Sequence, residues 1–111
     1  MSLLLNPRDI DFNLYELLDT EALTRTPRYA EHDRAVFDAV IEAARVLAEE
    51  QFAPHAAKLD ANEPSFDGKH VTLPAELKQA LEAYIAGGFM GIAAEAEHGG
   101  MQLPWVVGQA A

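Results

Sequence analysis

Cysteine is absent from this sequence of 111 residues, and its absence excludes disulfide bonds, thiolate metal sites and cysteine nucleophiles. Basic residues are scarce, because eight Lys and Arg stand against 18 Asp and Glu, for a formal net charge of −10. Binding to a phosphate backbone needs clustered basic side chains, so we expect no nucleic-acid partner. The same acidity makes the chain a poor first contact for the phosphates of a nucleotide.

Long hydrophobic runs are also missing. No segment approaches the roughly 20 apolar residues of a membrane span, and no basic start precedes a hydrophobic stretch. We therefore expect no membrane span and a cytoplasmic location. Half of the residues are hydrophobic. Many of these are alanine, the best helix former. At this length the sequence predicts one domain with a small core.

The strongest pattern lies in the middle of the chain. Apolar residues recur there at spacings of three and four, which predicts an amphipathic helix from about 33 to 60 with Asp33 as its N-cap. Pro54 removes one helical hydrogen bond, so we expect a bend there more than a stop. Val46 falls off the apolar stripe, whose members are Val36, Phe37, Val40, Ile41, Ala44, Leu47, Ala48 and Phe52.

Weaker patterns flank this helix. Residues 10–19 predict a short helix with Ile10, Leu14, Leu17 and Leu18 on one face. Residues 61–72 have the composition of a loop. A further helix is predicted to open at Pro74 and end at Gly87–Gly88. Its predicted buried stripe is Leu77, Leu81, Tyr84 and Ile85.

The regular helical spacing of apolar residues stops after the glycine pair at 87–88. An apolar connection, 89–94, leads through a polar turn to Gly99–Gly100, and 103–107 then predict the opening of another apolar helix. Because a natural domain rarely ends where an apolar element begins, we expect a truncated piece of a longer protein. The predicted fold is all-α, a small helical bundle. Residues 1–30 form an N-terminal extension with a short helix, and 31–111 a helical domain that is incomplete at its C-terminal end.

No arrangement of residues predicts catalysis. His32, His55, His70 and His98 match no metal-ligand spacing, and they are better explained as separate surface or interface histidines. The carboxylates are numerous, but nothing in the sequence indicates an enclosed site that would tune them for proton transfer. The glycine pairs match neither the dinucleotide fingerprint nor the phosphate-binding loop. We therefore assign no catalytic, cofactor-binding or metal-binding residue to this chain.

Two motifs carry a family resemblance: Ala53-Pro-His-Ala-Ala-Lys-Leu-Asp60, and Gly88-Phe-Met-Gly-Ile-Ala-Ala-Glu-Ala-Glu-His-Gly-Gly100. With them, the segment from about 36 to 107 resembles the N-terminal helical domain of the FAD-dependent acyl-CoA dehydrogenases. The chain departs from the family at Glu95, where a proline is usual, and at His98, where an aromatic residue is frequent. The stretch 12–18 looks like the N-terminal extension of a long subgroup, similar to methylmercaptopropionyl-CoA dehydrogenase.

The resemblance implies a parent protein that oxidises an acyl-CoA to the 2,3-enoyl-CoA with FAD. In that family the catalytic glutamate lies in the C-terminal domain, and the flavin is held mainly by the middle β-domain and a neighbouring subunit. These 111 residues alone are therefore expected to be inactive and to bind no FAD. The implied partners are the remaining domains of the parent chain, its acyl-CoA substrate, and further copies in a homo-oligomer.

Four residues are predicted to lie nearest an interdomain surface or the wall of the acyl channel: Gly99, Gly100, Met101 and Trp105. The alternative interpretation is a stand-alone helical protein-interaction module. Residues 103–111 separate the two interpretations. Their packing onto helices of the same chain favours the module, and their extension away from it favours the fragment.

Overall fold

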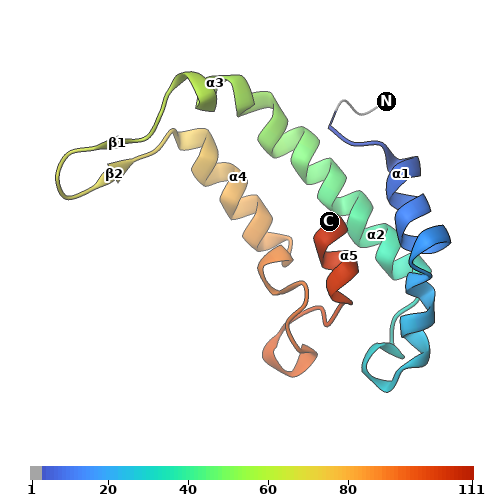
Figure 1. Cartoon of the computed structure of the whole chain (residues 1–111). Helices are drawn as coiled ribbons and strands as arrows, with labels where there is room; N and C mark the ends of the chain where they lie inside the picture. The colour runs from blue at the N-terminus through green and yellow to red at the C-terminus, as the bar shows by residue number, and fades with distance from the viewer. Residues whose placement is uncertain (1–3) are drawn as a thin grey trace.

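A computed structural model describes residues 4–111, which form a helical molecule with one short hairpin (Figure 1). The predicted helical class is confirmed, although two short strands accompany the helices. Single turns of 3-10 or π-helix (η) join the longer elements. In chain order the elements are α1 (Pro7–Asp11), η1 (Phe12–Leu17), η2 (Thr20–Arg25), η3 (Pro27–Tyr29), α2 (Arg34–Leu47), η4 (Ala48–Phe52), η5 (Ala53–His55), α3 (Ala56–Ala61), β1 (Ser65–Phe66), β2 (Val71–Thr72), α4 (Ala75–Ala86), η6 (Phe89–Gly91), η7 (Ala96–His98) and α5 (Trp105–Ala110).

The long central helix matches its prediction closely. Asp33 is the N-cap, and its carboxylate accepts a hydrogen bond from the backbone N–H of Val36 at 2.9 Å, which satisfies one of the free donors of the first turn. The helical path runs on from α2 through the π turn η4 and the 3-10 turn η5 into α3. Pro54 lies in η5. It therefore changes the helical register and bends the path without ending it, as expected.

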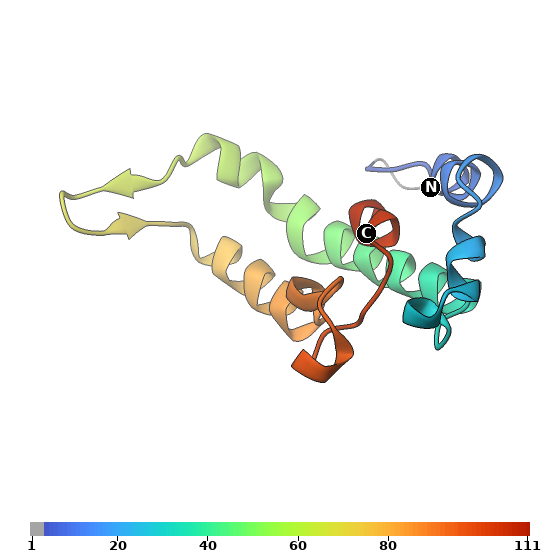
Figure 2. The same cartoon turned by 60° about the horizontal axis from the view of Figure 1, so that its bottom comes forward.

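The core lies where α5 meets α2. Phe37 and Val107 are fully buried and Leu103 is 2% exposed. They form one cluster, and partly buried hydrophobic residues pack against it: Tyr15, Val40, Ile41, Ile92, Met101 and Val106. Figure 2 shows α5 lying beside α2. Residues 103–111 therefore pack onto the helices of their own chain, which is the outcome predicted for the module interpretation.

The predicted buried stripe of α4 is wrong in part. Leu81 and Ile85 are about half exposed, whereas Ala80 is 2% exposed. The helix contacts η4 and η6, and the small alanine side chain faces the protein. Much of the wider apolar face of α4 therefore remains open to solvent.

The short N-terminal helix is also only partly as predicted. Leu14 is buried, but Leu17 and Leu18 are more than half exposed. The π turn η1 closes hydrogen bonds from i to i+5, so it disturbs the three-and-four spacing on which the prediction depended. Val36, in the first turn of α2, is likewise more exposed than expected, at 37%.

The loop predicted at 61–72 contains a hairpin. Strands β1 and β2 pair antiparallel, with Ser65 opposite Thr72 and Phe66 opposite Val71. Asp67 organises the turn, because its carboxylate accepts the backbone N–H groups of Lys69 and His70 at 2.8 Å each. The turn residues are Gly68 and Lys69, because the backbone N–H of Asp67 donates to the His70 carbonyl at 3.2 Å. Gly68 has a φ of +99°, a conformation that favours glycine.

The molecule as a whole is flat and open. Its principal extents are 52 × 36 × 18 Å and its radius of gyration is 16.8 Å, against about 13 Å for a compact chain of this length. Its accessible surface is 7716 Å², whereas a compact monomer of 12.1 kDa exposes about 6,000 Å². No helix among residues 4–111 is long and apolar enough to span a membrane.

Candidate interdomain surface

The segment from Gly88 to Leu103 is a folded loop in which three of the four glycines are required by its geometry. Gly88 ends α4 with a φ of +80° and Gly99 closes the next turn with a φ of +81°, a region that side chains with a Cβ avoid. Gly100 is required for a different reason. A Cβ built there would lie 2.1 Å from the carbonyl oxygen of Ala94.

Backbone hydrogen bonds fold this loop back on itself. The N–H of Met101 donates to the carbonyl of Gly91 at 3.0 Å, and that of Leu103 donates to Ile92 at 3.0 Å. The N–H of Gln102 donates to Ala94 at 2.9 Å. These bonds direct the chain out of the double-glycine turn and into α5, so the loop positions the buried residues of α5 on α2.

Gln102 connects the loop to the N-terminal part of the chain by hydrogen bonds. Its backbone has a φ of +52°, and its side-chain amide donates to the carbonyl of Arg28 at 2.8 Å while its side-chain oxygen accepts the N–H of Ala96. The ring Nε2 of His32 lies 3.0 Å from the Gln102 carbonyl. Arg28 also pairs with Glu95 at 3.0 Å, and this contact raises the pKa of the guanidinium.

Sequence analysis missed this network. Arg28 lies 67 residues from Glu95 and 74 from Gln102, so no local spacing connects them. Glu95 stands where the resembled family usually has a proline, and here its carboxylate holds two distant segments together.

The four predicted surface residues share one segment but do not converge on a pocket. Gly99 is exposed at the turn, and Gly100 is half-buried against Ala94. Met101 packs inward against the core. Trp105 is 69% exposed on α5, so its indole faces solvent. Met90, which was not predicted, is 71% exposed on the same loop.

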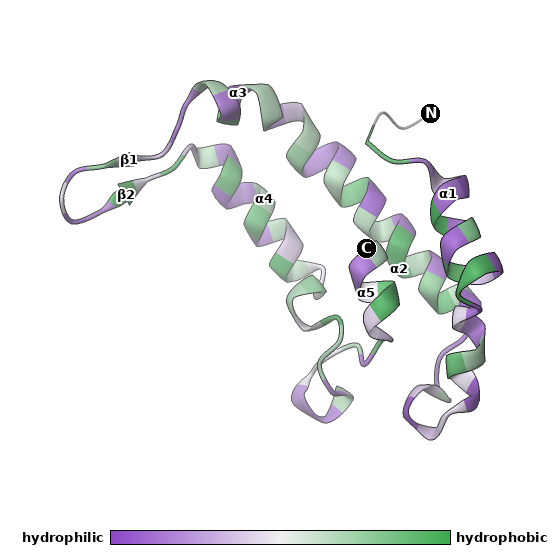
Figure 3. Cartoon of the chain, in the orientation of Figure 1, coloured by the Kyte–Doolittle hydropathy of each residue, from purple (hydrophilic) through white to green (hydrophobic). Residues whose placement is uncertain are grey.

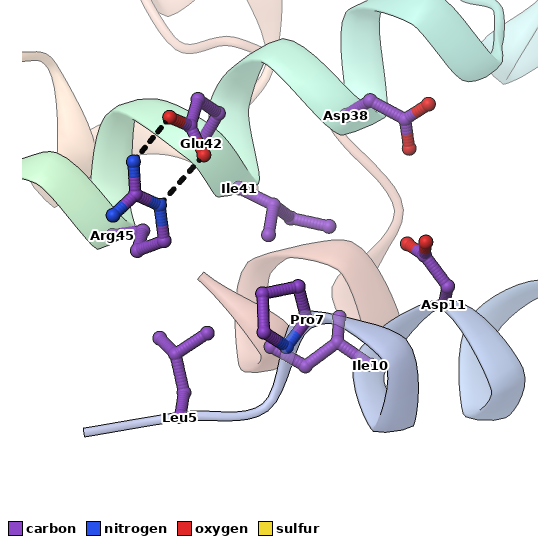
Figure 4. A pocket seen from close by; sticks show the side chains of 8 residues that line it. All are labelled: Leu5, Pro7, Ile10, Asp11, Asp38, Ile41, Glu42 and Arg45. Atoms are coloured by element: carbon purple, nitrogen blue, oxygen red, sulfur yellow. Dashed lines mark hydrogen bonds and ion pairs between the residues drawn. The ribbon is translucent and has the colours of Figure 1, made fainter. Parts of the chain in front are cut away.

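A pocket of about 250 Å³ lies between the N-terminal segment and α2 (Figure 4). Its wall is apolar in part and carries three carboxylates but a single cation, Arg45. That guanidinium is bonded to Glu42 and to Glu49, each with a contact of 2.5 Å, and it holds the pKa of Glu42 below its usual range. With its cation neutralised, the pocket disfavours phosphate. Its lining residues are Leu5, Pro7, Ile10, Asp11, Asp38, Ile41, Glu42 and Arg45.

Two further pockets are mainly apolar and share Phe52. The smaller, about 180 Å³, lies between α2 and α4 and includes Tyr84, Phe89 and Ala111. The larger, about 410 Å³, lies under β2 and α4. Among residues 4–111 no group of three or more His, Asp or Glu side chains is placed to hold a metal ion.

No protein-family model matches the chain, and neither a curated protein nor a solved structure matches it. The functional argument therefore depends on the motifs, the loop geometry and the exposed apolar surfaces of this chain.

Proposed function

We propose that this chain is the N-terminal helical domain of an FAD-dependent acyl-CoA dehydrogenase, in which it packs on the other domains and covers the acyl channel. The observation that carries the proposal is the loop from Gly88 to Gly100, the longer of the two motifs behind the resemblance. Three of its four glycines, Gly88, Gly99 and Gly100, occupy positions where a positive φ or a close backbone contact favours glycine, which supports the interpretation of the motif as a defined loop.

The exposed apolar side chains of this region support a packing role. Trp105 and Met90 are each about 70% exposed, on a molecule that exposes more surface than its mass predicts. Large apolar side chains in such positions are typical of surfaces that another domain covers. Covering the acyl channel would exclude water from the reacting flavin and strengthen the electrostatic interactions around the substrate.

The charge of the chain limits what it contributes to ligand binding. Arg45, the one cation of the pocket beside α2, is held by two carboxylates. In the proposed enzyme the phosphates of FAD and of the acyl-CoA are therefore bound by other domains. The role left to this chain is positional.

The test begins with the reading frame that encodes the chain. If it continues for several hundred residues past Ala111, the whole protein is purified, its flavin absorbance recorded, and its reduction of an electron-acceptor dye assayed with acyl-CoA substrates. Bound flavin and acyl-CoA-dependent dye reduction are expected. A stop codon directly after Ala111, or a full-length protein without flavin, would contradict the proposal.

A second candidate function is a stand-alone helical protein-interaction module. The specific observation in its favour is the burial of Leu103 and Val107 in the core of the same chain. The two candidates separate on the 1–111 chain itself. A module folds cooperatively and captures a partner through an exposed helix face, whereas the enzyme domain gains stability when the rest of the parent protein is supplied.

A further inference from the structure

The helical path from α2 to α3 changes its hydrogen-bonding pattern twice between Ala48 and Ala56. In the π turn η4 the N–H of Ala53 donates to the carbonyl of Ala48, and in the 3-10 turn η5 the N–H of Ala56 donates to that of Ala53. Pro54 lies inside η5 and has no N–H to donate. A 3-10 stretch in the middle of a helix often marks a hinge, so residues 48–55 are a candidate hinge.

A second candidate hinge lies at the far end of α4. The helix ends at Gly87, and Gly88 follows with a φ of +80°, a conformation that glycine adopts without strain. Residues 56–86, between the two hinges, contain α3, the hairpin and α4 (Figure 1), and we call them the arm. We call residues 4–47 and 89–111 the base. A hinge therefore lies at each end of the arm.

Polar contacts hold the arm and the base together, each within itself. Lys58 of α3 pairs with Glu76 in the first turn of α4, which links the two helices of the arm. In the base, Arg28 pairs with Glu95, and its carbonyl accepts a hydrogen bond from the side-chain amide of Gln102. We therefore expect each part to move as a unit.

The arm contacts the base and the first hinge through side chains that can slide. Ala80 is the buried residue of α4, at 2% exposure, and the helix lies against η4 and η6. Tyr84, one turn further along α4, stacks on Phe89 of η6, with ring centroids 5.5 Å apart and planes inclined by 21°. Small and flat apolar side chains allow packed elements to shift past one another without breaking hydrogen bonds.

Two apolar pockets give α4 room to tilt, and both include Phe52 of the first hinge. The larger, about 410 Å³, reaches Leu77 and Leu81 in the N-terminal part of α4. The smaller, about 180 Å³, reaches Tyr84 in its last turn. Figure 3 shows hydrophobic residues along α4 and along the neighbouring path of α2. Closely packed interfaces lack spaces of this size, so α4 is not locked in one position.

We propose that the arm tilts as a unit about residues 48–55 and Gly87–Gly88, with Ala80 as the contact over which α4 rocks. When the hairpin end of the arm moves toward Phe52, the larger pocket narrows. The opposite end of α4, at Tyr84, then moves away from α2, and the smaller pocket widens. The tilt therefore sets which of the two pockets is open.

This inference concerns the 1–111 chain itself and does not depend on the proposed enzyme function. The flavin assay and the measurements described next can therefore fail separately.

The test is a set of distances between pairs of spin labels, measured by double electron–electron resonance. The chain has no cysteine, so labels can be attached at introduced cysteines on exposed positions. Ala39→Cys with Asp60→Cys spans the first hinge. Ala39→Cys with Gln109→Cys lies within the base, and Asp60→Cys with Gln79→Cys lies within the arm.

The pair that spans the hinge should give a distance distribution broader than that of either control pair by more than about 2 Å, the scale of a hinge rearrangement. Equal widths for all three pairs would overturn the proposal. So would an arm pair as broad as the hinge pair, because the arm would then not move as a unit.

Pro54→Ala tests the location of the hinge. Alanine supplies the missing N–H and removes the ring that bends the helix, so the distribution of the Ala39–Asp60 pair should narrow to the width of the base pair. Pro7→Ala is the matched control, because Pro7 begins α1 in the base, and it should leave that distribution unchanged. A hinge pair that stays equally broad in Pro54→Ala contradicts a hinge at residues 48–55.

A further measurement needs no substitution. Hinge motions fall in the microsecond-to-millisecond range, which NMR relaxation dispersion detects. Leu77 and Tyr84 line different pockets, and their side-chain signals should share one exchange rate because one tilt changes both pockets. Val107, fully buried in the base, should show no such exchange. Unrelated rates for Leu77 and Tyr84, or no exchange at either, would refute the coupled tilt.

Discussion

Gly100 has the tightest backbone environment of any glycine in the chain. A Cβ there would lie 2.1 Å from the Ala94 carbonyl oxygen and 2.4 Å from its carbon. Both are backbone atoms and cannot rotate away as a side chain could. Gly100→Ala is therefore expected to reduce the free energy of unfolding by about 3 kcal/mol, the upper end of the usual cost of overpacking. Urea denaturation followed by circular dichroism measures this.

Gly91 provides the control for that substitution. It belongs to the same loop and lies beside Gly100, but a Cβ built on it would meet Gly100 Cα at 3.5 Å, an ordinary contact. Gly91→Ala should change stability by less than about 1 kcal/mol, since alanine restricts the unfolded chain without straining the folded one. Equal effects at the two positions would show that the close approach at Gly100 does not limit the fold.

Asp67 gives the hairpin a dependence on pH. Hydrogen bonds from the backbone N–H groups of His70 and Lys69 hold the pKa of its carboxyl below the ordinary value. A carboxyl with a lowered folded pKa stabilises the fold above its unfolded pKa of about 3.9, and this contribution is lost as pH falls through the folded value. The amide NMR signal of Lys69, which donates to the Asp67 carboxylate, should therefore show its carboxyl-linked shift below about pH 4. A side-chain carboxyl carbon signal of Asp67 that titrates above that pH would contradict this assignment.

At the scale of the element, the sequence predicted what local chemistry determines. Asp33 was identified as a cap and Pro54 as a bend, because both act within one turn of helix. The faces of the shorter helices were predicted less well. Leu81 and Ile85 have helical spacing but stay about half exposed, because the elements beside α4 cover them only in part. Spacing alone carries no information about how far neighbouring elements extend. The contacts of Gln102 could not be predicted from the sequence either, because its partner Arg28 is 74 residues away along the chain.

Two substitutions in α5 test whether this helix packs into the core. Val107 is fully buried against the Phe37 cluster, whereas Trp105, two residues earlier, is 69% exposed. Val107→Ala is expected to cost about 2 kcal/mol, because it removes two methyl groups from a small core and leaves a cavity. Trp105→Ala should cost less than about 0.5 kcal/mol, as exposed substitutions usually do. Chemical denaturation of both variants decides whether α5 belongs to the core, and the reverse order of costs would refute its placement.

For the molecule as a whole, the open shape is the property that links the proposals. A small core at one end holds α2, α5 and the double-glycine loop together, while the hairpin and α4 extend away from it (Figure 1). The two exposed apolar regions lie on different parts of the chain. Trp105 and Met90 belong to the segment proposed to pack on another domain, and Phe66 and Val71 belong to the hairpin. The composition predicted neither exposed surface, because a sequence in which half of the residues are hydrophobic is equally compatible with a closed helical bundle.

Solution scattering tests this shape directly. The chain at low concentration should have a radius of gyration near the 16.8 Å of the structure, because the hairpin and α4 extend away from the core (Figure 1). A closed bundle of this length would give about 13 Å. A radius near 13 Å would show that the hairpin and α4 fold back onto the core in solution, and neither exposed apolar region would then be available to a partner.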